Sequence, residues 1–521
     1  MLFNSYEFIL VFLPITLAGF LYLHHQHHVR TAFAWLVLCS LFFYGWWNPK
    51  YLLLIIGSIT INYLTGSLIL GARKQRRVMQ AKILLWFGVL FNLSLLGYFK
   101  YANFFLDNLN GLSGGGFQLA DLILPIGISF FTFQQITYLV DAHKGITEEH
   151  NPLQYSLFVV FFPQLIAGPI VHHSEMLPQF ADRKAIGAYA ENISIGLTIF
   201  SIGLFKKVVI ADTLALTATP VFAAADGGET LHFFEAWRGT FAYSFQLYFD
   251  FSGYSDMAIG LARMFGIKLP LNFHSPYKAT SIIDFWRRWH MTLSRFLRDY
   301  IYIPLGGGRR GTLRKNVNIM ATMLIGGLWH GAGWTFVVWG GIHGLLILLN
   351  HVWRLLNPFG DGGVIGRFAA RMLTFLLVSL AWVFFRSESF DGALRIFDGM
   401  RNLPHTLVEK LGPIAGFLST IGFRFEGPWI DGSDLVSAAW LVVLLVMVWA
   451  LPNTQQWMAR FEPALDMLRA GISDGDTGVQ ERPTRWPMWA PTGIWALLIA
   501  GFFLAAFLNL SQVSEFLYFQ F

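Results

Sequence analysis

Long apolar runs alternate with short polar segments along the whole chain. A helix that crosses the hydrocarbon core of a bilayer needs roughly 20 apolar residues, in practice about 17 to 25. The candidate spans are residues 8–23, 31–47, 51–70, 83–99, 122–140, 152–171, 192–205, 239–261, 316–329, 333–350, 373–385, 435–451 and 489–510. The pattern therefore predicts an all-α polytopic membrane protein with roughly 11–13 spans.

Several of these runs are short or carry residues that a plain crossing would avoid. The run 122–140 contains Pro125, Gly127 and Ser129, and the run 239–261 contains Asp250 and Asp256. Polar or irregular segments are tolerated at membrane depth only where protein or a water-filled cavity surrounds them. We therefore expect a helical core around a central funnel, with tilted or re-entrant helices.

Glycine-rich and polar segments mark the boundaries between parts of the chain. The stretch 471–487 has the composition of a loop and separates a final apolar run from the rest. We expect a membrane-embedded core over residues 1–452, a loop over 453–488, and a C-terminal transmembrane helix with an extracytoplasmic tail over 489–521.

Composition supports the membrane interpretation. Of 521 residues, 55% are hydrophobic and only 13% are charged, and the mean hydropathy is +0.51, which is too apolar for a soluble enzyme. The net charge of +6 does not indicate nucleic-acid binding, because the basic residues fall between apolar runs. The single cysteine, Cys39, excludes a disulfide framework. No spacing of histidines and carboxylates predicts a metal site.

Basic segments predict the orientation in the membrane. Residues 71–82 contain five basic residues and no acid, so this loop should face the cytoplasm, as should the basic segment 263–315. Three spans precede the first loop, which places the N-terminus outside. No Lys or Arg follows Arg485, so the C-terminal tail should also lie outside.

Two histidines are the strongest candidates for chemistry. His290 closes the motif D-F-W-R-R-W-H, and His330 lies in L-W-H-G inside an apolar run. An ionisable residue in lipid is a functional hypothesis by default. A neutral imidazole, with an unperturbed pKa near 6.5, suits a general base that takes a hydroxyl proton, a role worth roughly 10² to 10⁴ in rate. The alternative for His330 is a core histidine bonded to a backbone carbonyl.

The neighbours of these histidines leave further alternatives open. Gly326, Gly327 and Gly331 leave room beside His330 for a substrate or for a close backbone approach. His290 precedes His330 by 40 residues, so only the fold can bring them together. His290 can support catalysis, or its motif can anchor a helix at the headgroup level. The other residues of that motif that we consider are Trp286, Arg287, Arg288 and Trp289. His343 is better explained by polar packing.

Two polar segments are candidates for substrate binding. Asp250, Ser252 and Tyr254, in Y-F-D-F-S-G-Y-S-D-M, can orient a substrate, but we prefer a pairing of Asp250 with a base such as Arg287 or Arg288. The segment P-L-G-G-G-R-R-G-T offers backbone N–H groups and guanidinium groups that suit phosphates. It can equally be a cytoplasmic turn. Its arginines are Arg309 and Arg310.

Taken together, these motifs resemble the membrane-bound O-acyltransferase family. The likeness rests on F-W-R-R-W-H, L-W-H-G, Y-F-D-F-S-G-Y-S-D-M-A-I-G, L-P-I-G-I-S-F-F-T-F, F-F-P-Q-L-I-A-G-P-I and G-Y-F-K-Y-A-N-F. It covers residues from about 97 to 350 and is looser after that. Within the family, the chain looks most like bacterial alginate O-acetyltransferases.

The resemblance implies a reaction and a location. An acetyl group would leave a cytoplasmic thioester, either acetyl-CoA or an acylated carrier protein, with no bound cofactor, and would reach a hydroxyl of an exported polysaccharide. It implies that His330 is catalytic, that His290 is its companion, and that Trp329 belongs to the same site. It also implies the bacterial inner membrane with periplasmic termini, and a periplasmic SGNH or serine-esterase-type partner. Alginate is the first acceptor, with cellulose or another exopolysaccharide as the alternative.

The end of the chain carries one further resemblance. S-E-F-L-Y-F-Q-F, residues 514–521, is similar to the F-x-Y-x-x-F motif on the small membrane partner of the teichoic acid D-alanyl transferase. The likeness implies that Tyr518 carries the acyl group. A phenol has a pKa near 10 and needs a base such as His330 to attack a thioester. The alternative is an aromatic belt at the outer interface.

A different class of function stays open at this point. His290, His330, Asp250 and Asp256 could form the relay of a proton-coupled transporter, without covalent chemistry. That class predicts inverted repeats, and the sequence shows none.

Overall fold

The computed structural model describes residues 1–117, 123–147, 151–181, 186–356, 362–429, 432–465, 486–511 and 517. Over these residues the chain is predominantly helical, with two short strands. Six helical stretches are long and apolar enough to cross a membrane, and three further apolar helices are shorter. The six are Phe8–His25, Tyr51–Lys74, Val78–Ser113, Tyr189–Asp226, Trp334–Leu356 and Gly363–Arg386. This confirms the predicted all-α membrane class, while the funnel and the full number of crossings stay predictions.

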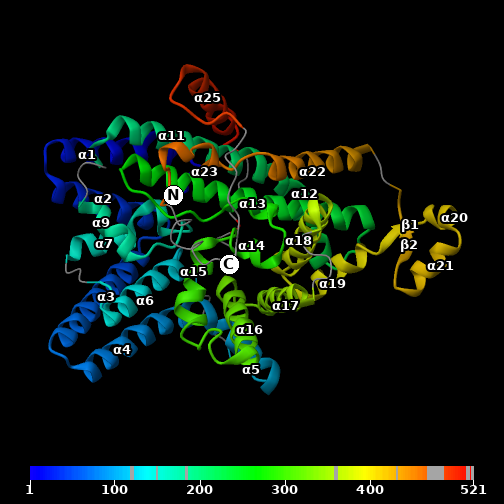
Figure 1. Cartoon of the computed structure of the whole chain (residues 1–521), viewed down its shortest axis with the longest axis horizontal. Helices are drawn as coiled ribbons and strands as arrows, with labels where there is room; N and C mark the ends of the chain where they lie inside the picture. The colour runs from blue at the N-terminus through cyan, green and yellow to red at the C-terminus, as the bar shows by residue number, and fades with distance from the viewer. Residues whose placement is uncertain are drawn as a thin grey trace. The chain divides into compact units, whose positions relative to one another are not determined.

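The chain divides into two compact units, each assembled from separate stretches of sequence. Unit 1 comprises Met1–Phe205, Gly253–Asn272 and Thr454–Gln512, and Figure 1 shows its first helices in blue. Its elements are η1 (Phe8–Phe12), α1 (Leu13–His25), α2 (Val29–Gly45), α3 (Tyr51–Lys74), α4 (Val78–Leu96), η2 (Gly97–Tyr101), α5 (Ala102–Ser113), α6 (Ile128–Lys144), α7 (Pro152–Val160), α8 (Phe162–Leu165), α9 (His173–Ala181), α11 (Tyr189–Phe205), α23 (Thr454–Trp457), η6 (Ala459–Phe461) and α25 (Gly493–Phe507).

Unit 2 comprises Lys206–Ser252, Phe273–Asn453 and Val513–Phe521. Its elements are η3 (Lys206–Ala211), α12 (Asp212–Asp226), η4 (Pro276–Lys278), α14 (Ile282–Trp286), α15 (Met291–Leu297), η5 (Arg298–Tyr302), α16 (Gly311–His330), α17 (Trp334–Leu356), α18 (Gly363–Arg386), α19 (Phe390–Gly399), β1 (Asn402–Pro404), α20 (Leu407–Leu411), α21 (Pro413–Thr420), β2 (Arg424–Gly427) and α22 (Gly432–Ala450). Helix α13 (Phe233–Met264) contributes its first part to unit 2 and its second to unit 1.

Helix α13 is the longest α-helix that the structure describes, with 32 residues. Most of its side chains are buried, so protein covers the polar residues that made the run 239–261 unusual. Asp250 and Asp256 are 1% and 5% exposed. Since buried polar groups are tolerated where protein satisfies them, an unbroken helix accounts for this run, and re-entry is not required there.

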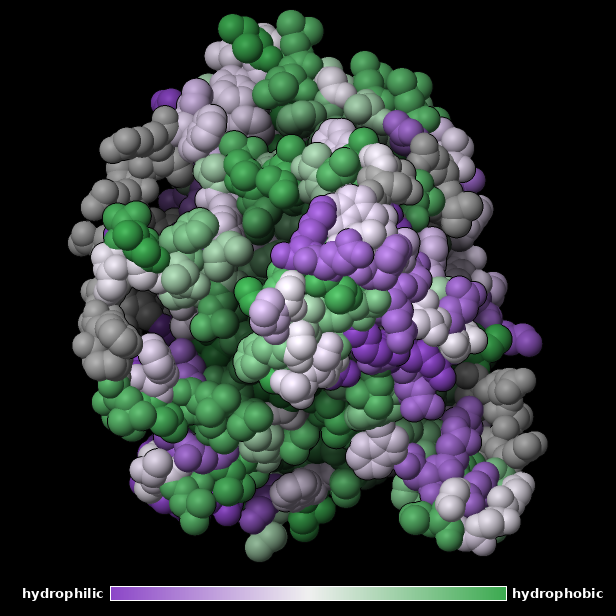
Figure 2. Space-filling model, turned by 90° about the vertical axis from the view of Figure 1, so that its right-hand side faces the viewer, coloured by the Kyte–Doolittle hydropathy of each residue, from purple (hydrophilic) through white to green (hydrophobic). Residues whose placement is uncertain are grey.

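A small lobe between α18 and α22 holds the only strands among the described residues. Strand β1 pairs in parallel with β2, with Asn402 opposite Arg424. Arg401 and Arg424 both form ion pairs with Asp398. Figure 2 views the molecule from the side of this lobe and shows hydrophilic residues gathered next to hydrophobic ones. The surface of this part of unit 2 is therefore mixed, with ion pairs beside exposed apolar side chains such as Ile414 and Phe417.

Candidate active site

Helices α16 and α17 hold His330 in unit 2 through a close approach of their backbones. A Cβ atom on Gly327 would lie 2.3 Å from the carbonyl oxygen of Phe336, and one on Gly340 would lie 2.3 Å from that of Met323. Small residues let helices in membranes pack at such short range. His330 is the last residue of α16, so this contact fixes its position.

The glycines beside His330 serve the packing of protein. A Cβ on Gly331 would lie 2.1 Å from the ring of Phe336, and one on Gly326 would lie 3.1 Å from Leu297. Of the two alternatives that the sequence left open for Gly327, close backbone approach is the one observed. The space that these three glycines release is occupied by other residues of the chain.

Aromatic rings surround the imidazole of His330. Its ring centroid lies 4.9 Å from Trp329, 5.1 Å from Trp339 and 5.1 Å from Phe385, each at a steep angle. The residue is 6% exposed. An imidazole in such a shell has little access to water.

The fold brings His290 to His330. Their ring centroids are 6.3 Å apart, although 40 residues separate them in sequence. His290 precedes α15 in the left-handed conformation, with φ of 42°, and its ring packs 4.8 Å from Phe251. It lies outside the candidate spans, and complete burial lowers the pKa of its imidazole to about 3. His290 is therefore neutral at physiological pH.

A third histidine, His343, belongs to the same aromatic cluster. The ring of Trp339 lies between the two histidines: its centroid is 4.8 Å from that of His343 and 5.1 Å from that of His330. Trp286 donates its indole N–H to Nδ1 of His343 across 3.2 Å. The sequence assigned His343 to polar packing, and its bond to Trp286 agrees with a role in orienting that indole.

Sequence reasoning missed three rings that build this shell. Trp339, Trp382 and Phe385 are buried, and Trp339 stacks on Trp382 at 5.5 Å. The signal was helical spacing: Trp339 and His343 are four residues apart on α17, and Trp382 and Phe385 are three apart on α18, so each pair shares a helix face. These residues were not singled out because the apolar runs around them contain many other aromatic residues.

The D-F-W-R-R-W-H motif divides into structural and exposed residues. Arg288 donates Nε–H to Asp284 across 2.8 Å, and Trp289 is 2% exposed and stacks on Phe285. Arg287 is exposed. Of the two arginines, only Arg287 presents its side chain at the surface, where a charged donor could reach it.

The prediction that Asp250 pairs with Arg287 or Arg288 was wrong in the choice of partner. Lys207 is the base: its Nζ lies 2.6 Å from Asp250 and 2.7 Å from Asp212. All three residues are at most 5% exposed. Sequence distance concealed the pair, because Lys207 stands at the end of another apolar run. Ser252 is buried in the same unit, whereas Tyr254 lies in unit 1 and stacks on Phe3 at 4.9 Å.

The glycine-rich turn before α16 is ordered by a residue that the sequence did not single out. Asn318 donates Nδ2–H to the carbonyls of Gly307, across 2.9 Å, and Leu305, across 3.3 Å. Arg309 and Arg310 are exposed. The turn therefore presents two exposed arginines on a backbone that Asn318 holds in place.

The C-terminal residues are only partly described. Tyr518 lies outside the described residues. Its neighbour Leu517 is 0% exposed and belongs to the hydrophobic cluster that contains Trp289, Trp339 and Phe385. Leu517 therefore belongs to a hydrophobic cluster that includes two rings in contact with His330. Among the described residues no group of three or more His, Cys, Asp or Glu gathers as for a metal ion.

Comparison with known proteins assigns this arrangement to a family. Residues 84–360 match the model of the membrane-bound O-acyltransferase family, MBOAT, and that segment contains His290, His330 and His343. The chain is 47% identical over 432 residues to a peptidoglycan O-acetyltransferase of Helicobacter pylori, covering 77% of this chain and 80% of the relative.

Two other groups of relatives are similar to the chain. It is 42% identical over 412 residues to the probable alginate O-acetylase AlgI of Pseudomonas aeruginosa, covering 77% of this chain and 75% of the relative. It is 28% identical over 254 residues to a teichoic acid D-alanyltransferase of Bacillus subtilis, covering 46% of this chain and 61% of the relative. The resemblance inferred from the motifs is confirmed.

Proposed function

The chain belongs to the membrane-bound O-acyltransferase family and is a membrane O-acetyltransferase, and on that premise we propose that it carries acetyl groups from a cytoplasmic thioester to an exported glycan. The observation that supports this most is the pair of imidazoles, His290 and His330, 6.3 Å apart in a buried aromatic shell. The donor is acetyl-CoA or an acylated carrier protein, and the proposed reaction uses no bound cofactor. Covalent transfer replaces the transporter interpretation.

His330 is the general base of the proposed reaction. It takes the proton of the attacking hydroxyl as the oxygen bonds to the thioester carbonyl, and returns that proton to the departing thiolate. His290, neutral because its pKa is about 3, accepts or donates one hydrogen bond at the same site. Trp329 and the exposed Arg287 complete the donor site, and Arg309 and Arg310 attract its phosphates.

Tyr518 is the proposed carrier between the two faces of the membrane. Attack by its phenol breaks the thioester and forms an aryl acetate, and attack by a sugar hydroxyl then frees the phenol and forms the sugar acetate. Phenoxide leaves more readily than a sugar alkoxide, so the second step runs downhill. The burial of Leu517 in the hydrophobic cluster that also contains Trp339 and Phe385 supports this proposal.

Alginate is the first candidate for the acceptor polymer. In this proposal, a periplasmic SGNH or serine-esterase-type partner completes its acetylation at the bacterial inner membrane. Peptidoglycan is the second acceptor, because the relative with 47% identity is a peptidoglycan O-acetyltransferase. Cellulose and other exopolysaccharides follow. Expression in a strain without its own O-acetyltransferases, followed by quantification of ester acetate on each polymer, distinguishes these acceptors.

Labelling of purified membranes with radioactive acetyl-CoA tests the catalytic assignment. We expect His330→Ala to lower acetyl transfer by about 10² to 10⁴, whereas His25→Ala, which changes an exposed histidine, should behave as the wild type. Full activity in His330→Ala would refute the general-base assignment.

The carrier step has its own test. Tyr518→Phe keeps the ring and removes the nucleophilic oxygen, so we expect loss of base-labile label on the protein and loss of polymer acetylation. Tyr189→Phe, in a helix of unit 1, is the matched control. A Tyr518→Phe enzyme that acetylates polymer at the wild-type rate would rule out the relay and leave direct transfer.

A further inference from the structure

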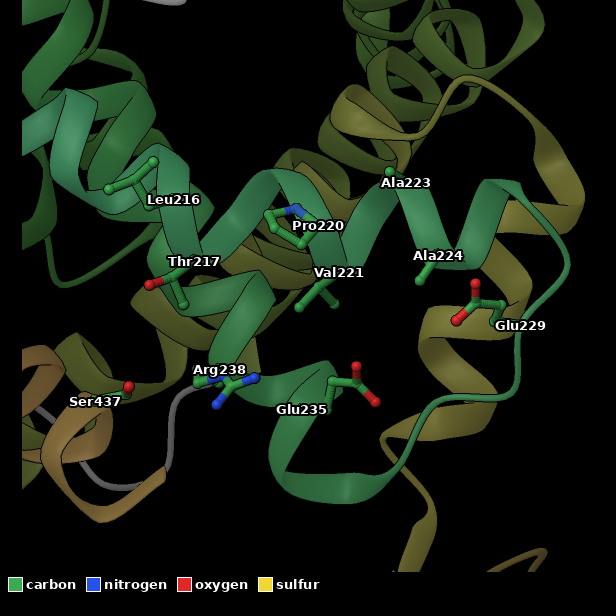
Figure 3. A pocket seen from close by; sticks show the side chains of 10 residues that line it. All are labelled: Leu216, Thr217, Pro220, Val221, Ala223, Ala224, Glu229, Glu235, Arg238 and Ser437. Carbon is green, nitrogen blue, oxygen red and sulfur yellow. The ribbon is translucent and has the colours of Figure 1, made fainter. Parts of the chain in front are cut away.

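A cavity of about 650 Å³ lies in unit 2 between α12, the start of α13 and α22, which is within the range of small-molecule sites. It contains none of the residues of the histidine site. Its lining residues are Leu216, Thr217, Pro220, Val221, Ala223, Ala224, Glu229, Glu235, Arg238 and Ser437. Figure 3 shows Glu229, Glu235 and Arg238 facing Val221 and Ala224 of α12 across the opening.

Carboxylates outnumber cations at this cavity. Glu229 and Glu235 line it, and the guanidinium of Arg238 is already paired with Asp434. Glu235 accepts the backbone N–H of His232 across 3.4 Å through one oxygen, Oε2. With Asp434, three carboxylates therefore stand against the single guanidinium of Arg238. This excess of negative charge favours a ligand with a positive charge and disfavours one that carries only negative charge.

The α12 wall adds small residues and groups that can accept hydrogen bonds. Pro220 stands inside the helix and has no N–H for the carbonyl of Leu216, four residues earlier. Both residues line the cavity, so this wall includes a helix carbonyl without its usual donor, and the hydroxyl of Thr217. These groups accept hydrogen bonds from a cationic donor.

The rim of the cavity is formed by apolar helices whose outer side chains are exposed. Residues 216–224 belong to the candidate span Tyr189–Asp226, and Leu216 is 74% exposed. On α22, another apolar helix, Leu435 and Val436 beside Ser437 are 57% and 61% exposed. Apolar side chains on the outside of spanning helices contact acyl chains. A ligand that matches both the apolar rim and the acidic interior of the cavity is therefore an amphiphile with a cationic headgroup.

We propose that this cavity binds the headgroup of a phospholipid with a primary ammonium, as in phosphatidylethanolamine. The ammonium donates to Glu229 and Glu235, the phosphate lies toward the Arg238 guanidinium, and the acyl chains run along Leu216 and Leu435. Charge-assisted hydrogen bonds to the two carboxylates supply the selectivity. A choline headgroup has no N–H to donate, and a glycerol headgroup has no cation.

Native mass spectrometry of the full-length protein in detergent tests the proposal. Dioleoyl-phosphatidylethanolamine, -choline or -glycerol is added at equal concentration, and bound lipid is counted. We expect the ethanolamine lipid to bind about tenfold more tightly than the other two, and Glu229→Gln/Glu235→Gln to remove that preference. The matched control is Glu409→Gln/Glu426→Gln, which changes two exposed glutamates of the lobe. Equal binding of the three lipids by the wild type would overturn the proposal.

A second measurement does not depend on the glutamate variants folding. A spin label at Leu216→Cys, with the buried Cys39 replaced by alanine, reports which phase reaches the rim. We expect lipid-soluble oxygen to relax the label more than a water-soluble nickel chelate. The reverse order, or displacement of bound lipid by alginate or peptidoglycan oligosaccharides, would show a water-facing glycan site and refute the lipid assignment.

Discussion

The two site histidines differ in how the backbone holds them. His330 ends a regular helix, whereas His290 adopts φ of 42° at the start of α15, a conformation that costs a non-glycine residue of order 1 kcal/mol. That strain is tolerated because Phe251, Phe273 and Trp329 enclose the ring. The ring of His290 lies 6.3 Å from that of His330, so we assign His290 a positioning role toward His330.

Burial of His290 predicts a dependence of stability on pH. Its folded pKa of about 3 lies below the unfolded value near 6.5, so the unfolded chain binds more protons between these values. The contribution of neutral His290 to the free energy of unfolding is therefore fully present above pH 6.5 and is lost as the pH falls toward 3. Thermal unfolding in detergent should show about 2 kcal/mol less stability at pH 5 than at pH 7.5 from this residue.

His290→Asn isolates that contribution, because Asn tolerates the left-handed conformation and does not titrate. We expect this variant to have a flatter pH dependence of its unfolding temperature than the wild type. His25→Asn, at an exposed position, should keep the wild-type slope. An unchanged slope in His290→Asn would contradict the assigned pKa.

Single residues also show where sequence reasoning stops. The identity of His330 and His290 as candidates followed from ionisable groups in apolar or aromatic surroundings, and the structure places them together. The partner of Asp250 did not follow, since Arg287, Arg288 and Lys207 are equally basic in the sequence. Only the packing of α13 against η3 selects Lys207.

At the scale of elements, the buried triad of Lys207, Asp212 and Asp250 explains why the helical stretch Tyr189–Asp226 is longer than the sequence predicted. The sequence predicted a span ending at residue 205, directly before Lys206 and Lys207. The helix instead continues to Asp226 through the π-helical turn η3. Lys207 remains inside because Asp212 and Asp250 neutralise it. The triad thereby ties α12 to α13, which carries Phe251 against His290.

Removing the ammonium of this triad should be costly. Lys207→Met leaves two buried carboxylates without it, and breaking a buried ion pair costs about 3–5 kcal/mol. We expect a large fall in the unfolding temperature in detergent. Lys206→Met, the adjacent and partly exposed lysine, should cost less than about 1 kcal/mol. Equal effects of the two substitutions would mean that the triad does not hold these helices.

Two neighbouring glycines on α17 give a matched test of its contact with α16. A Cβ on Gly340 would meet the backbone oxygen of Met323 at 2.3 Å, whereas one on Gly341 would meet Leu324 at an ordinary 3.6 Å. Gly340→Ala should destabilise the protein by about 1–3 kcal/mol and, by displacing His330, lower acetyl transfer about a hundredfold. Gly341→Ala should be neutral or slightly stabilising, since alanine favours helix. Similar losses in both variants would exclude the close approach as the cause.

At the scale of the whole molecule, apolar runs predicted where helices lie but not how they group. Each predicted run overlaps a helix, because lipid permits few other structures. The two units are interleaved in sequence, with α13 shared between them, and no local pattern encodes that division. The boundaries predicted near residues 452 and 488 stay predictions, and residues 466–485 lie outside the described chain.

The membrane orientation is the last prediction, and it follows from charge and helix order. With the turn 303–310 in the cytoplasm, as the positive-inside rule requires, α16 and α17 form an antiparallel pair that returns to that side. Helix α18 then crosses outward and places the lobe 387–429 outside. With Cys39 replaced by alanine, an impermeant maleimide should label Ser419→Cys in intact spheroplasts, and Gln75→Cys only after permeabilisation. Both positions are exposed, so accessibility alone does not separate them, and the opposite pattern would invert the protein and with it the direction of acetyl transfer.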